Sequence, residues 1–110
     1  MNALLIPVEG APRTIDIREG FELADMQAAV HGNIELIVLN SHPNLSVFVN
    51  EEGKFTEPTN LTATRWAQPD LFAGDWIAGP MLVLGPVDNA GNTTALSEEA
   101  KDELLTQLDT

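Results

Sequence analysis

The sequence predicts an α+β fold: a mostly antiparallel sheet of about five or six strands with two helices, in the order β-β-α-β-β-β-α. Short apolar runs of strand length are separated by Gly, Pro and Asn turns. Two other segments repeat apolar residues at helical spacing. The strands come in runs with the helices kept apart from them, which is typical of an α+β fold. The length suits a single domain over residues 1–110.

The first two strands are expected to form a hairpin. Residues 2–8 carry an almost unbroken apolar run, which indicates a strand buried on both faces. Residues 13–18 alternate polar and apolar side chains, as a half-buried strand does. Residues 9–12 contain Gly and Pro and are expected to form the turn between them.

A helix is predicted after Gly20. Leu23, Met26 and Val30 recur at positions i, i+3 and i+7, so they share one face. Gly32 is placed to end this helix in the left-handed conformation.

The middle of the chain predicts two further strands and then an ambiguous segment. Residues 33–39 and 45–50 are the expected strands, and Gly53 is expected to hold a left-handed position in the hairpin turn that follows. Residues 57–70 are bracketed by prolines, and their centre is compatible with a single helical turn or with an irregular loop.

The next strand is expected over residues 75–84. It is interrupted at Gly79 and Pro80, which indicates a bulge or a sheet edge because proline has no N–H to donate. Trp76 lies at the start of this apolar run and is expected in the core. Trp66 lies in the ambiguous segment, where it is either a lid over the sheet or an exposed anchor for a partner.

The last element is a predicted helix over residues 98–108, with Ser97 as its N-cap. Its apolar stripe has two possible destinations, its own sheet or a second copy of the chain in a homodimer. If neither covers the stripe, the helix is free to dock in a partner's groove. Leu104 and Leu108 on this stripe, together with Trp66, are therefore the candidate protein-binding residues.

Composition excludes several classes of function. There are 17 acidic and 5 basic side chains, for a net charge of −12. So few cations make direct binding to nucleic acid phosphates a poor expectation. No apolar run is long enough to cross a bilayer, and the N-terminal residues lack the pattern of a signal peptide, so we expect a cytoplasmic protein without a membrane partner. Cysteine is absent.

The sequence shows no catalytic, cofactor or metal site. His31 and His42 are the only histidines, and each lies at a helix end or turn without other ligands at short spacing. Residues 88–99 begin with Asp and end with Glu as a calcium loop does, but Ala90 and Thr93 occupy positions where that loop needs a ligand and a glycine. We therefore expect a protein that is not an enzyme and carries no cofactor.

Four stretches together resemble the small proteins grouped as domain of unknown function 3846. They are residues 23–35, 49–54, the set Asn60, Ala63 and Thr64, and residues 74–80 with Asp88 and Gly91. His31 stands where the first of two glycines often lies in that pattern. Such proteins are common in phages, plasmids and their bacterial hosts, so the resemblance implies an accessory protein of a mobile element, acting in the host cytoplasm if a phage encodes it.

Three functional hypotheses remain. The leading one is a non-enzymatic accessory or regulatory protein that binds another protein. The second is an acidic mimic of nucleic acid that inhibits a host DNA-binding protein or nuclease, since −12 over 110 residues attracts basic partners. The third is a small-ligand binder or an enzyme.

Overall fold

A five-stranded antiparallel sheet forms the centre of the protein in a computed structural model that describes residues 1–109. The strands are β1 (Asn2–Ile6), β2 (Arg13–Asp16), β3 (Ile34–Ile37), β4 (Ser46–Asn50) and β5 (Met81–Leu84). Their order across the sheet is β2-β1-β5-β4-β3, and every neighbouring pair is antiparallel. The last strand thus inserts between two hairpins, and the predicted α+β class with an antiparallel sheet is confirmed.

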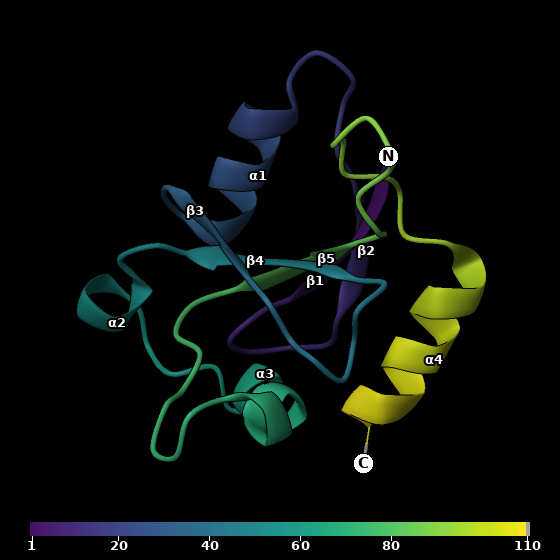
Figure 1. Ribbon diagram of the computed structural model, residues 1–110. Coiled ribbons are helices and arrows are strands. Elements are labelled where there is room, and N and C mark those ends of the chain that lie inside the picture. The colour runs from purple at the N-terminus through teal and green to yellow at the C-terminus, as the bar shows by residue number, and fades with distance from the viewer. Residues whose placement is uncertain (110) are drawn as a thin grey trace.

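Helices cover both faces of this sheet (Figure 1). α1 (Glu22–Val30) lies on one face, and α3 (Leu61–Ala67) and α4 (Glu98–Leu108) lie on the other. A short α2 (Gly53–Thr56) follows β4, and a 3₁₀ turn, η1 (Gln68–Asp70), follows α3. Residues 1–109 thus contain four α-helices where the sequence predicted two. The two extra helices are short, and such helices leave little apolar periodicity to detect.

Two apolar cores sandwich the sheet. Leu5, Met26 and Phe48 belong to the core under α1, and Ile6, Val47 and Val83 belong to the core under α3 and α4. Side chains alternate between these cores along each strand, so β1, β4 and β5 are buried almost throughout. This arrangement explains the continuous apolar run predicted for the first strand.

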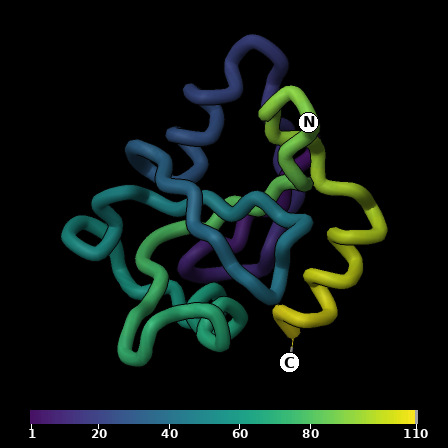
Figure 2. Tube along the Cα trace, in the orientation of Figure 1, coloured from purple at the N-terminus to yellow at the C-terminus, as the bar shows by residue number. Residues whose placement is uncertain are grey.

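The C-terminal helix packs against its own sheet. Its N-cap is Ser97, as predicted, and the Ser97 hydroxyl accepts a hydrogen bond from the Ala100 N–H at 3.1 Å. Leu104 and Leu108 are buried in the core that also contains Val83. The chain leaves the sheet, turns back along it and ends on the far side from the N-terminus (Figure 2). The apolar stripe therefore takes the first of its two predicted destinations.

Two glycine predictions are wrong. Gly53 is not in a left-handed turn but begins α2, where a Cβ atom would lie 2.7 Å from the carbonyl oxygen of Ala78. Its small size permits this close approach. The left-handed residue after α1 is His31, with φ of 70°, and not Gly32. Gly32 instead lies against the Asn50 side chain, which leaves no room for a Cβ atom.

The ambiguous segment contains a helix. Asn60 caps α3, and its side-chain oxygen accepts a hydrogen bond from the Ala63 N–H at 3.0 Å. The strand predicted over residues 75–84 is shorter, because regular pairing begins only at Met81, after Pro80. Before that point the pairing is a single isolated bridge between Thr59 and Ala78.

Candidate functional site

The three residues singled out from the sequence lie inside the fold. Trp66, Leu104 and Leu108 all belong to the core beneath α3 and α4. Trp66 is 9% exposed and its Nε1–H donates to Oε1 of Gln107 at 2.8 Å. Trp66 is therefore the lid over the sheet and not an exposed anchor. A partner could contact only the small exposed part of each side chain, which is 9% for Trp66, 2% for Leu104 and 7% for Leu108.

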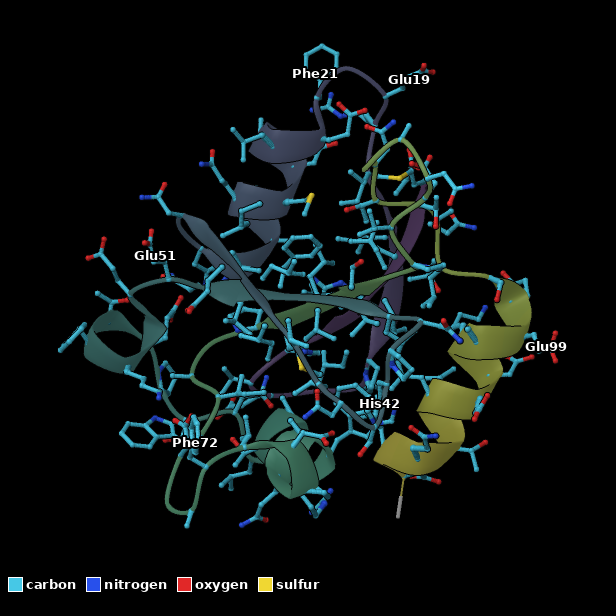
Figure 3. The ribbon with its side chains drawn as sticks, in the orientation of Figure 1. Glu19, Phe21, His42, Glu51, Phe72 and Glu99 are labelled. Carbon is cyan, nitrogen blue, oxygen red and sulfur yellow. The ribbon has the colours of Figure 1, made fainter. Side chains whose placement is uncertain are left out.

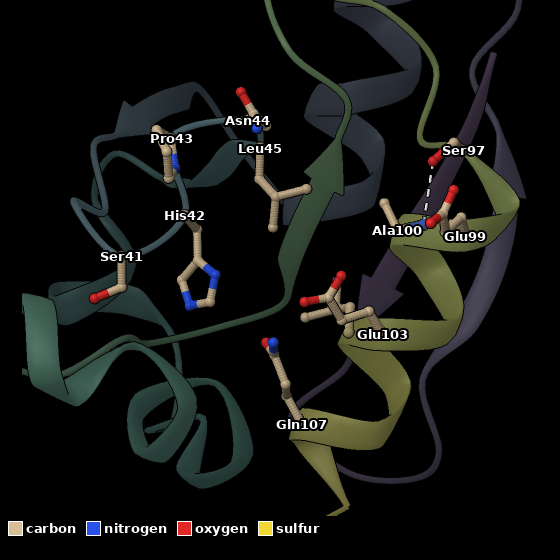
Figure 4. Close-up of a pocket in the computed structure, with 11 residues that line it drawn as sticks. Ser41, His42, Pro43, Asn44, Leu45, Ser97, Glu99, Ala100, Glu103 and Gln107 are labelled. Carbon is tan, nitrogen blue, oxygen red and sulfur yellow. Dashed lines mark hydrogen bonds between the residues drawn. The ribbon is translucent and has the colours of Figure 1, made fainter.

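A small hollow lies beside this core, between the turn before β4 and α4. It has a volume of about 280 Å³. His42 lines it, and the centre of the His42 ring lies 4.4 Å from the centre of the Trp66 ring, on which it stacks. His42 and Glu103 project toward it from facing sides (Figure 4). Within residues 1–109, however, no hydrogen bond or ion pair joins His42 to Glu103. Nothing in this hollow aligns an acid with a base.

Exposed aromatic side chains mark a different part of the molecule. Phe55 on α2 is 90% exposed. In the loop after η1, Phe72 is 89% exposed and Trp76 is 40% exposed. The core position expected for Trp76 is wrong, because the strand begins at Met81 and leaves Trp76 in the loop. We call Phe55, Phe72 and Trp76 the aromatic surface.

An ion pair joins the two segments that carry the aromatic surface. Lys54 Nζ on α2 pairs with Oδ1 of Asp75 in the loop, and it also lies 4.7 Å from the centre of the Trp76 ring. Asp75 is itself held in the loop, since its N–H donates to the Phe72 carbonyl and its Oδ1 accepts from the Trp76 N–H. The hydrogen bonds from Lys54 and from that N–H lower the pKa of the Asp75 carboxyl. These contacts join α2, which carries Phe55, to the loop that carries Phe72 and Trp76.

The segment that carries the aromatic surface is rich in acidic residues. Residues 51–76 contain five acids, and their only cations are Lys54 and Arg65. Glu51 and Glu52 are exposed just before α2. Glu51 and Phe72 lie on the same side of the molecule, whereas Phe21, another exposed aromatic residue, lies at the opposite end (Figure 3). Glu51 and Glu52 thus add negative charge next to α2, whereas Glu57, Asp70 and Asp75 are engaged with His31, Ser41 and Lys54.

Sequence reasoning missed the aromatic surface. Phe55 and Phe72 lie among turn residues and belong to no apolar repeat of a helix or strand. A large aromatic residue in such a place was the available signal, since the packing of a core gives it no role there.

Neither a metal-binding cluster nor a membrane-spanning helix is found in residues 1–109. No group of three or more His, Asp or Glu side chains within residues 1–109 is placed to hold a metal ion. In the same residues, no helix has both the length and the apolar character needed to cross a membrane.

Comparison with known proteins identifies the family. The family model described as "Domain of unknown function (DUF3846)" matches residues 1–109, so the chain belongs to this family. This finding confirms the resemblance carried by the four sequence stretches. Searches of curated proteins and of solved structures found no match.

Proposed function

We propose that this is a non-enzymatic accessory or regulatory protein, of the kind that phages and other mobile elements encode, which binds a second protein through the aromatic surface in the cytoplasm. The observation that carries the proposal is the exposure of Phe55, Phe72 and Trp76 on segments joined by one ion pair. Burying a Phe side chain is worth about 1.5–3 kcal/mol. Leaving two of them exposed forgoes that stabilisation in the free protein and makes it available on binding.

The partner's docking segment is proposed to be cationic and apolar. Aromatic residues at the centre of an interface, with charged residues around them, are the usual arrangement of a binding hot spot. Glu51 and Glu52, exposed just before α2, and the net charge of −12 attract a basic segment and speed its approach. Lys54 lies over one face of the Trp76 ring, so an incoming cation would contact this ring at its other face or by displacing Lys54.

Fluorescence polarisation with labelled synthetic peptides tests the proposal. The first probe alternates Lys with Leu, the second alternates Lys with Ser, and the third alternates Glu with Leu. We expect the Lys–Leu peptide to bind most tightly. The double variant Phe55→Ser/Phe72→Ser should weaken its binding at least ~10-fold, or about 1.4 kcal/mol, because both aromatic contacts are lost.

Phe21→Ser is the matched control, because it removes an exposed aromatic residue from the opposite end of the molecule. It should leave the dissociation constant unchanged. Equal binding of the Lys–Leu peptide by the wild type and the double variant would overturn the proposed surface. If the Lys–Ser peptide binds as tightly as the Lys–Leu peptide, charge alone drives binding, as the nucleic-acid-mimic alternative requires.

A further inference from the structure

A second and larger hollow lies at the C-terminal end of α1. Its volume is about 540 Å³, and it forms where this helix end, the turn after β1, the segment after α2 and the segment before β5 meet. Three prolines, Pro7, Pro58 and Pro80, line it together with the small residues Ala28 and Ala29. Proline fixes its own backbone torsion, so these walls are stiff.

A buried asparagine ties two of these walls together. Asn60 is fully buried, and its Nδ2 donates to the carbonyl oxygens of Ile6 at 3.0 Å and Gly79 at 2.9 Å. Each acceptor directly precedes a wall proline, Pro7 or Pro80. The asparagine therefore fixes the positions from which both prolines extend.

A second buried asparagine holds the end of α1. Asn50 Nδ2 donates to the carbonyl oxygens of Val30 and His31, each at 3.2 Å, and its Oδ1 accepts from the Glu52 N–H at 2.8 Å. His31 is thereby kept at φ of 70°. This backbone conformation is unfavourable for a residue other than glycine, and such outliers cluster at functional sites.

The His31 side chain is oriented by Glu57. Its Nδ1 lies 2.6 Å from Oε1 of Glu57, whose side chain is largely buried. Gly79 makes room for that carboxylate, because a Cβ atom there would lie 3.0 Å from Glu57 Cγ. An ionised carboxylate only accepts hydrogen bonds, so Nδ1 is the nitrogen that carries the proton in the neutral ring. Nε2 then remains as an acceptor for a ligand.

Two opposite charges on the hollow are unpaired. The side chains of Arg13 and Glu9 both line it, and neither makes a hydrogen bond or ion pair within residues 1–109. Among the five Lys and Arg residues, three pair with carboxylates: Arg18, Lys54 and Lys101. The other two cations are Arg13 and Arg65, and of these only Arg13 lines the hollow, where its guanidinium suits a carboxylate.

We propose that this hollow binds a small zwitterion, a free α-amino acid or short peptide with an apolar side chain. Its carboxylate pairs with Arg13, and its ammonium donates to His31 Nε2 and to Glu9. Its apolar side chain packs on Leu5, Ala28 and the prolines. An anion without the ammonium would face the Glu9 carboxylate unpaired, which disfavours it.

Isothermal titration calorimetry at pH 7 tests this with leucine and leucyl-leucine as probes. N-acetyl-leucine lacks the ammonium and leucinamide lacks the carboxylate, so each should bind at least ~10-fold more weakly than leucine. Arg13→Gln should weaken leucine binding by a similar factor, while Arg13→Lys, which keeps the charge, should weaken it less. Arg65→Gln is the matched control, because it removes another exposed, unpaired arginine and should change nothing.

His31→Asn provides an independent variant, since Asn tolerates a positive φ and lacks the ring nitrogen that Glu57 orients. It should weaken leucine binding while the urea midpoint shows that the variant is folded. No binding of either probe at millimolar concentration, equal binding of the blocked analogues, or unchanged binding by Arg13→Gln would overturn the proposal. Phe55→Ser/Phe72→Ser should bind leucine normally, which separates this site from the aromatic surface.

Discussion

The segment around Asn60 and the aromatic surface differ in which kind of side chain they bury. The first buries a polar side chain, and the second exposes apolar ones. Asn60 is completely buried, whereas Phe72, later in the same part of the chain, is 89% exposed. Asn60 makes three hydrogen bonds that join the end of β1, the approach to β5 and the start of α3. Phe72 shares no comparable packing, and its neighbours are loop residues and acids.

This difference separates stability from function. A buried polar side chain with all of its hydrogen bonds made holds chain segments where strand pairing stops. An exposed aromatic side chain contributes little to the free energy of unfolding, so its value to the protein lies in what it contacts when a partner is bound. Substitution of the buried asparagine should therefore change the free energy of unfolding, whereas substitutions on the aromatic surface should change the binding of a partner.

Asn60→Ala should give the largest loss of stability. It leaves the carbonyl oxygens of Ile6 and Gly79 and the N–H of Ala63 without their partner in the interior. We expect the free energy of unfolding in urea to fall by about 3 kcal/mol. Asn44→Ala removes an exposed asparagine and should stay within ~0.5 kcal/mol of the wild type. A loss that small for Asn60→Ala would mean that water replaces its hydrogen bonds.

Gly53→Ala should have the next largest effect, because the new Cβ would lie 2.7 Å from the Ala78 carbonyl oxygen. Moving α2 to relieve the contact should cost about 1–3 kcal/mol in urea unfolding. Gly53→Asn decides between this cause and a left-handed backbone. Asn tolerates the left-handed conformation but not the close contact, so it should be at least as harmful as Ala. A markedly smaller loss of stability in Gly53→Asn than in Gly53→Ala would support the left-handed turn instead.

The sequence predicted the parts of the fold that depend on local pattern. The strand ranges 2–8, 33–39 and 45–50 contain β1, β3 and β4, and the helix over residues 98–108 agrees with α4. These succeed because each depends on the order of polar and apolar residues within one segment.

The predictions that were wrong, or that the sequence could not make, depend on contacts between segments far apart in the chain. Position 53 requires a glycine because the Ala78 carbonyl oxygen approaches it closely. Asn60 is buried where its side chain donates to the carbonyl oxygens of Ile6 and Gly79. No local pattern contains that information. The candidate site failed for a similar reason: Trp66 and Leu104 are apolar in sequence but covered in the fold, whereas Trp76 remains outside because its strand begins later.

Arg18→Gln extends the comparison to an exposed charged group that does have partners. The Arg18 side chain, and then its backbone N–H, lower the pKa of Asp25 from 3.8 to about 2. Because the pKa is lower in the folded state, this interaction stabilises the fold above about pH 4 and is lost as the pH falls through 2. In the variant, the pKa should rise toward 3.8 while staying below it, since the backbone hydrogen bond remains.

An NMR titration of the Asp25 carboxyl carbon measures this rise directly. The fall of stability between pH 5 and 2 should also be shallower in Arg18→Gln. Arg65→Gln should leave the Asp25 titration unchanged. An Asp25 pKa that stays near 2 in Arg18→Gln would assign the shift to the backbone hydrogen bond alone.

The most direct test of the central claim measures stability and binding on the same preparation of Phe55→Ser/Phe72→Ser. If the aromatic surface exists for a partner, the free energy of unfolding should stay within ~0.5 kcal/mol of the wild type, because both side chains are exposed. Binding of the Lys–Leu peptide should weaken at least ~10-fold. A loss of more than ~1 kcal/mol of stability with unchanged peptide binding would contradict the account, since these aromatic residues would then support the fold and not an interface.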